Sequence, residues 1–198
     1  MSQNLFPPTR PVFRPYLIPG RHEPLDGLLG QLIGERVGPV SGRGLDGDFA
    51  RLRFGDQMAR IGDDLSGRHW SAETLLVGRS YGGYLLLHAL ADLPPFPGRV
   101  LLLSPVLGPA LSPTGRGGSR PPRADRLPRL VREGRFPRPA AMVVYTGGAD
   151  PGCAPELARR IIPRIPGARL RIIPEAGHDL SADQIRAAVS EILEGTAP

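Results

Sequence analysis

Residues 74–90 read TLLVGRSYGGYLLLHAL: an apolar run, a glycine-rich turn and a second apolar run. The first run, Thr74–Gly78, is apolar on both faces, as strands inside parallel sheets are. The second, Tyr84–Leu90, predicts a buried helix. A buried strand that leads through a turn into a helix is the repeating unit of α/β proteins. We therefore expect a parallel sheet with this strand in its middle.

Short apolar runs on both sides of this stretch predict further strands. The expected strands are Tyr16–Ile18, stopped by Pro19 and Gly20, a weakly indicated Val37–Val40, then Arg99–Leu103, Ala140–Tyr145 and Leu170–Ile173. Amphipathic stretches separate them, which is the pattern of parallel strands joined by helices. The sequence thus predicts a three-layer, doubly wound α/β fold with about six mainly parallel strands and helices on both faces.

The helices are predicted from residues that recur on one face. The first begins at Leu25, and a second is capped by Asp48 and buries positions 54, 58, 61 and 65. A third spans positions 157–165. The last begins at a capping box, Ser181 with Gln184, in which each residue bonds the backbone of the other.

Length and composition indicate one globular domain, residues 1–198, with 40% hydrophobic and 22% charged residues. No apolar run approaches the roughly 18 residues that a membrane span needs. Residues 1–20 lack a basic region followed by an apolar core, so we expect no signal peptide. The single cysteine, Cys153, excludes an internal disulfide. Together these features favour a cytoplasmic protein.

All 25 basic residues are arginine. The absence of lysine excludes a Schiff-base lysine, a P-loop lysine and a Ser-Lys dyad. Arginine, alanine, glycine and proline are abundant together, which indicates a biased genome. The sequence pI of about 10.6 is therefore weak evidence for nucleic acid as a partner, and we expect none.

The excess charge is concentrated in residues 109–139. This segment holds eight arginines (positions 116, 120, 123, 126, 129, 132, 135 and 138) against Asp125 and Glu133, and so carries the whole net charge of +6. It is long for a connection between a strand and the next one, which favours either a functional insertion or a mobile loop. A solvated basic loop is one interpretation, and a lid that attracts anionic ligands is the other.

The turn Gly78-Arg79-Ser80-Tyr81-Gly82 has the form that serine nucleophiles take. A sharp turn between strand and helix forces the serine into a strained conformation. The residues two before and two after the serine are expected to approach each other closely, so both need to be glycine. The pattern alone is not specific in a chain with 26 glycines. Its place between a predicted strand and a predicted helix makes it informative.

Two later strands end in the residues that a serine nucleophile requires. The strand at 140–145 leads into Gly147-Gly148-Ala149-Asp150, and the strand at 170–173 leads to Gly177-His178. With Gly78–Gly82 before them, these motifs resemble the α/β-hydrolase superfamily, in which nucleophile, acid and histidine follow in this order. The resemblance extends from Tyr16 to Leu193. Only 15 residues precede Tyr16, so we expect a compact member that lacks the first strands of larger relatives.

The resemblance implies a catalytic role for three residues. Ser80 corresponds to the nucleophile, His178 to the general base and Asp150 to the acid that orients the histidine. Asp179 and Glu175 are competing candidates for the acid, but each is close to His178 in sequence, unlike the family pattern. Such an arrangement requires no cofactor.

The resemblance also indicates where an oxyanion would be held. One donor is expected to be the backbone N–H of Tyr81, and the second that of Gly20 or Arg21, in the loop after the first strand. His22 in the same loop is a candidate for lining the substrate site. Arg79 is expected to brace the turn against neighbouring carboxylates. Four histidines and one cysteine without ligand spacing predict no metal site.

These residues favour hydrolysis of a carboxylic ester through an acyl-enzyme on Ser80. A thioesterase or acyltransferase would use the same residues on a carrier-bound acyl group, and an acidic carrier would fit the basic segment. A peptidase belongs to the same mechanistic set. From another class, the chain could be a non-catalytic binding protein on the same fold. Oligomeric state cannot be read from the sequence.

Overall fold

Six parallel strands form one sheet in the computed structural model, which describes residues 12–109 and 120–195. The strands are β1 (Arg14–Ile18), β2 (Ser41–Gly42), β3 (Thr74–Arg79), β4 (Arg99–Leu103), β5 (Ala141–Gly147) and β6 (Ala168–Ile173). Their order in the sheet is β2-β1-β3-β4-β5-β6. The register places Val77 opposite Leu17 on one side and opposite Leu101 on the other, so β3 lies inside the sheet as predicted.

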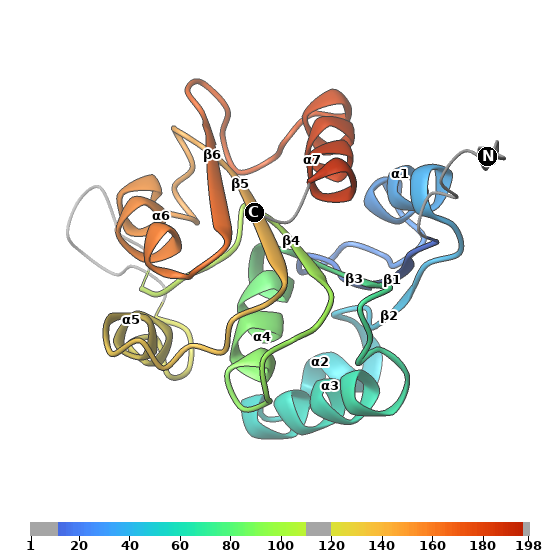
Figure 1. Cartoon of the computed structure of the whole chain (residues 1–198), viewed down its shortest axis with the longest axis horizontal. Helices are drawn as coiled ribbons and strands as arrows, with labels where there is room; N and C mark the ends of the chain where they lie inside the picture. The colour runs from blue at the N-terminus through green and yellow to red at the C-terminus, as the bar shows by residue number, and fades with distance from the viewer. Residues whose placement is uncertain (1–11, 110–119, 196–198) are drawn as a thin grey trace, which may run out of the picture.

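Helices cover both faces of this sheet (Figure 1). They are α1 (Leu28–Val37), α2 (Gly47–Arg51), α3 (Phe54–Arg68), α4 (Ser80–Leu90), α5 (Arg126–Arg132), α6 (Pro155–Ile161) with a 3-10 turn at Ile162–Arg164, and α7 (Ala182–Glu194). Helices α1 and α7 pack on one face, and α3, α4 and α6 pack on the other. The predicted three-layer, doubly wound fold is confirmed.

Alternation along β3 explains why both faces are covered. Leu75 and Val77 pack with α1 and α7, whereas Leu76 packs with α3 and α4, and all three side chains are fully buried. A strand with an apolar residue at every position can be stable only between two layers of helices, because either face left open would expose hydrophobic surface to water.

The structure corrects three local expectations. The predicted strand Val37–Val40 is wrong: Val37 ends α1, and the short strand β2 follows at Ser41–Gly42. The helix expected after Asp48 is two helices, because Leu52 and the residue after it have extended backbone with ψ of 149° and 151°. The first of these helices starts after Asp46, so Asp48 lies inside it rather than capping it.

The fourth correction concerns the central helix. Helix α4 begins at Ser80 itself and not at Tyr84. Its first turn contains Gly82 and Gly83, which have weak helix propensity and therefore did not predict helix. Tertiary packing overrides that propensity, because the helix start has to approach β1 closely.

The strand order creates a crevice between β1 and β3. The chain leaves β1 toward β2 on one side and leaves β3 toward β4 on the other. Connections that diverge in this way leave the carboxyl ends of the two strands uncovered, and ligands bind there in open α/β sheets. The loop after Ile18 and the turn at Ser80 lie at this point of the fold.

The described part of the basic segment is anchored in the core. Helix α5 buries Leu127, Leu130 and Val131, and Phe136 beyond it is also buried. Residues 110–119 of the expected lid lie outside the described residues. In residues 12–109 and 120–195, every helix is too short or too polar to cross a bilayer.

Candidate active site

Ser80 occupies a strained backbone position between β3 and α4. Its φ is +50°, in the left-handed region that residues with a side chain rarely adopt. The strain is held by close backbone contacts on both sides of the serine. A Cβ on Gly78 would lie 2.7 Å from the Cα of Gly83, and a Cβ on Gly82 would lie 2.2 Å from the carbonyl oxygens of Ile18 and its neighbour. Gly78 therefore faces Gly83, and Gly82 faces β1, rather than the two facing each other.

Gly82→Ala is expected to destabilise the protein by about 1–3 kcal/mol, because backbone atoms must move to admit the methyl group. Gly62→Ala is the matched control: it lies inside α3, and its new Cβ would have no atom within 4 Å. That control should stabilise the helix by roughly 0.5–1 kcal/mol. Urea denaturation followed by circular dichroism measures both, and equal stabilities of the two variants would contradict the account.

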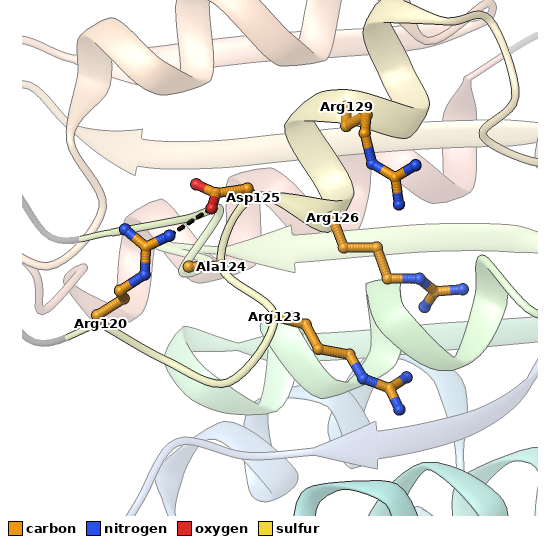
Figure 2. Close-up of a pocket in the computed structure, with 6 residues that line it drawn as sticks. All are labelled: Arg120, Arg123, Ala124, Asp125, Arg126 and Arg129. Carbon is orange, nitrogen blue, oxygen red and sulfur yellow. Dashed lines mark hydrogen bonds and ion pairs between the residues drawn. The ribbon is translucent and has the colours of Figure 1, made fainter.

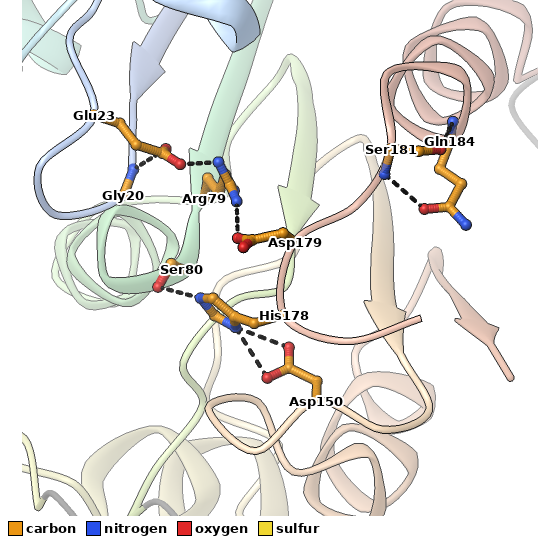
Figure 3. Close-up of polar contacts among 9 residues, drawn as sticks. All are labelled: Gly20, Glu23, Arg79, Ser80, Asp150, His178, Asp179, Ser181 and Gln184. Carbon is orange, nitrogen blue, oxygen red and sulfur yellow. Dashed lines mark hydrogen bonds and ion pairs between the residues drawn. The ribbon is translucent and has the colours of Figure 1, made fainter. Parts of the chain in front are cut away.

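Ser80, His178 and Asp150 form a hydrogen-bonded chain at the carboxyl ends of β3, β6 and β5 (Figure 3). The distance from Ser80 Oγ to His178 Nε2 is 2.8 Å, and His178 Nδ1 lies 2.9 Å and 3.0 Å from the two oxygens of Asp150. An ionised carboxylate only accepts, so Nδ1–H donates to Asp150 and Nε2 is free to accept the Ser80 proton. The structure thus brings together the three residues that the sequence singled out.

The carboxylate of Asp150 is buried but remains favoured as an anion. Its side chain is 0% exposed, and it accepts the backbone N–H groups of Gly152 at 2.7 Å and Cys153 at 2.9 Å. Burial alone would raise the pKa of Asp150, but the hydrogen bonds from His178 and these two amides lower it below its ordinary value. The two amide donors were not predicted. Asp150-Pro151-Gly152 is a turn signature in which the aspartate bonds the following backbone, and it could have indicated them.

The competing acids lie elsewhere. Asp179 pairs with Arg79, at 2.6 Å, and Glu175 is exposed and forms no hydrogen bond within the described ranges. Cys153 offers no second nucleophile, since burial raises the pKa of its thiol to about 12. The Cys153 side chain packs in the hydrophobic core.

Two segments beside Ser80 carry backbone N–H groups that could bind an oxyanion: the first turn of α4 and the loop after β1. The Tyr81 N–H lies in the first turn of α4, where helical residues have no intrahelical acceptor. The expectation for Gly20 needs correction: its N–H already donates to Glu23 Oε2, at 2.8 Å, although a Cβ on Gly20 would lie only 3.5 Å from Ser80 Cβ. The backbone N–H of Arg21 stays a prediction for the second donor.

Arg79 connects the three loops that surround the serine. It precedes Ser80, forms an ion pair with Glu23 in the loop after β1, and reaches Asp179, the residue after His178 (Figure 3). Its side chain is only 15% exposed, so water screens these pairs less than pairs on the open surface. The expected bracing role has these two carboxylates as partners, which residue spacing alone could not identify.

Arg79→Met should lower kcat by about 10²-fold with little change in KM, because small displacements of positioned groups cost that much. Arg14→Met is the control, since Arg14 forms an exposed ion pair with Glu73, at 2.8 Å, at the opposite end of β1. Steady-state kinetics on a chromogenic ester measures both. If the two variants lose the same activity, Arg79 has no special positioning role.

A pocket of about 350 Å³ borders the turn at Ser80. Its walls combine apolar and polar side chains: Arg21, His22, Leu45, Ala50, Leu52, Phe54, Gln57, Tyr81 and Pro122. The guanidinium of Arg21 lies over the Tyr81 ring, 4.1 Å from its centroid. His22 lines this pocket with φ of +66°, and its contact with a substrate stays a prediction. Where the chain is described, histidine, cysteine and acidic residues form no group of three that could ligate a metal.

Comparison with known proteins identifies the fold. No protein-family model matches the sequence, and none of the curated proteins matches it. The structure is similar to a monoacylglycerol lipase of Paleococcus ferrophilus (TM-score 0.67, 16% identity, 91% of this chain and 93% of that chain covered). It is also similar to the esterase domain of a Rhodothermus marinus protein (0.63, 17%, 94% and 87%) and to Est1E of Butyrivibrio proteoclasticus (0.64, 15%, 94% and 89%). The chain has the α/β-hydrolase fold.

Proposed function

We propose that the protein is a serine hydrolase that cleaves a carboxylic ester through an acyl-enzyme on Ser80. The observation that carries the proposal is the hydrogen-bonded chain from Ser80 through His178 to the buried carboxylate of Asp150. A strained serine beside an imidazole that an anion orients is the arrangement that activates an alcohol. The esterases and the lipase with the same fold support ester substrates.

The reaction proceeds in two halves. Ser80 Oγ attacks the ester carbonyl while its proton passes to His178 Nε2, and the negative charge moves to the carbonyl oxygen. The C–O bond to the leaving group then breaks, and the imidazolium gives its proton to the departing alcohol. Water, deprotonated by His178, attacks the acyl-enzyme, and collapse of the second intermediate releases the acid and returns the proton to Ser80.

Two groups stabilise the charges that form in these steps. Asp150 stays ionised and stabilises the imidazolium of His178, which its depressed pKa supports. We assign the oxyanion to the backbone N–H groups of Tyr81 and Arg21. Donors fixed in advance by a helix start and a turn need no reorganisation when the charge appears.

The proposal is tested with p-nitrophenyl esters of increasing acyl length. The wild-type protein should release p-nitrophenol with a burst equal to the enzyme concentration if deacylation is slower than acylation. A non-catalytic binding protein would release none above the background rate, and that result would remove the proposal. The acyl length with the highest kcat/KM reports the size of the pocket at Tyr81.

A thioesterase or acyltransferase is the second candidate function. The same three residues attack a thioester, and the observation that favours this candidate is the group of arginines near the pocket. Comparing thioesters with oxygen esters of the same acyl group distinguishes the two functions.

A further inference from the structure

Four arginines line a second hollow, of about 470 Å³, beside the start of α5 (Figure 2). Its lining is Arg120, Arg123, Ala124, Asp125, Arg126 and Arg129. Asp125 is the one carboxylate in that lining. A hollow with four guanidinium groups and one acid has a strongly positive potential, and its concave shape concentrates that potential.

Two of the four arginines have their charge compensated. Arg120 pairs with Asp125, and Arg126 pairs with Asp92. Arg123 and Arg129 form no ion pair within residues 12–109 and 120–195, and both are exposed. Figure 2 shows the side chains of Arg123, Arg126 and Arg129 extending to the same side, away from Asp125. The guanidinium groups of Arg123 and Arg129, which have no ion-pair partner in the described residues, are therefore available to one ligand.

A buried histidine of α4 lies beneath these arginines. His88 is fully buried in α4, and the guanidinium of Arg126 donates to its carbonyl oxygen at 3.2 Å. Burial, with the charges of Arg126 and Arg123, lowers the pKa of His88 to about 3. His88 is thus neutral and adds no charge beneath the arginines.

The backbone that carries the arginines is held in place. Tyr84 in α4 donates its hydroxyl to the carbonyl oxygen of Pro122, at 2.6 Å, and Ala124 is buried. Arg123 has φ of +58°, a left-handed position that costs a non-glycine residue roughly 1–2 kcal/mol. The hydrogen bond at Pro122 and the burial of Ala124 therefore hold the backbone on both sides of Arg123.

Arg123 links this hollow to the pocket beside Ser80. Its guanidinium lies 5.7 Å from the ring centroid of Phe54, and Phe54 lines the pocket that Tyr81 borders. Pro122 lines that pocket too, and Tyr81 stacks on Tyr84 with ring centroids 5.7 Å apart. A substrate whose carbonyl lies at Ser80 and whose body fills the pocket extends toward the arginines.

We propose that this hollow is a subsite for a phosphate-bearing part of the substrate. The inference rests on the proposed function, because the subsite serves the reaction at Ser80. Phosphate carries up to two negative charges and several acceptor oxygens. Two or more guanidinium groups can bind it at once, because each donates a pair of parallel N–H groups to its oxygens. A single carboxylate would pair with only one of these guanidinium groups. The substrate class is thus a phosphorylated acyl ester or thioester.

Three thioesters of one acyl group test the subsite: acyl-pantetheine, acyl-4′-phosphopantetheine and acyl-coenzyme A. They share the reacting carbonyl and differ in phosphate. The wild-type protein should have a kcat/KM for a phosphorylated thioester roughly 10- to 100-fold above that for acyl-pantetheine. Comparing acyl-4′-phosphopantetheine with acyl-coenzyme A distinguishes a requirement for a single phosphate from a requirement for a nucleotide with several phosphates.

The double variant Arg123→Gln, Arg129→Gln should lose that preference and leave acyl-pantetheine hydrolysis unchanged. Arg36→Gln, Arg186→Gln is the control: it removes the same charge from α1 and α7, on the opposite face of the sheet. The proposal is overturned if the wild-type protein treats the three thioesters alike, or if the control loses the preference equally. Failure of the proposed function differs, since no ester or thioester would then be cleaved.

Discussion

Ser80→Ala should lower kcat for a chromogenic ester by roughly 10⁶-fold. In the proposed mechanism, the substitution removes the atom that forms the covalent bond, and His178 then has no alcohol to deprotonate. A residual rate from the backbone donors alone is expected above the uncatalysed reaction. The measurement is the initial rate at saturating substrate, with the variant purified apart from the wild-type protein, because a trace of wild type would dominate.

Ser66→Ala provides the matched control for this loss. Ser66 lies on the exposed side of α3, and its replacement also removes one hydroxyl. The control should retain full activity, and circular dichroism should show that both variants fold. A Ser80→Ala variant that keeps even a tenth of the activity would contradict the assignment of the nucleophile.

Asp150→Asn should lower kcat by roughly 10⁴-fold with the fold intact. The amide NH₂ of asparagine donates to His178 Nδ1, which forces the ring proton onto Nε2. Nε2 then donates to Ser80 instead of accepting its proton, so the base is in the wrong tautomer. The amide also cannot balance the charge of the imidazolium. Steady-state kinetics of the variant measures the loss.

The stability of this variant gives a second readout with a defined sign. Asp150 has a lowered pKa in the folded protein, so its ionised form stabilises the fold above its unfolded pKa of about 4. That contribution disappears as pH falls through the folded pKa. The difference in unfolding free energy between wild type and Asp150→Asn should therefore shrink below about pH 4. A difference that grows in acid would contradict the hydrogen-bonding account of Asp150.

The central strands could be predicted from the sequence because their uninterrupted apolar residues fit only one structural environment. Residues 99–103 form a strand with the predicted bounds, since an apolar run buried on both faces fits only a parallel sheet between helices. Ser80, Asp150 and His178 could be predicted together for a related reason: the carboxyl ends of parallel strands lie at the same edge of the sheet.

The features of the fold and the site that the sequence did not predict depend on contacts between residues that are distant in the chain. Strand β2 has two residues, Ser41 and Gly42, and exists only because it pairs with β1. The sequence does not single out Glu23, because its two partners, the Gly20 N–H and Arg79, become apparent only once the loop after β1 lies beside the turn at Ser80. Local propensity contains no information about such contacts, so the sequence could not show that the Gly20 N–H is already bonded to Glu23.

Labelling with a fluorophosphonate tests the central claim most directly. Trypsin cleaves after Arg79, and the peptide from Ser80 to Arg99 contains Ser80 as its only serine. We predict that the wild-type protein gains one phosphonate on this peptide, located to Ser80 by tandem mass spectrometry, and that Ser80→Ala gains none. An unlabelled wild-type protein, or a Ser80→Ala variant labelled to the same extent, would show that Ser80 is not an activated nucleophile.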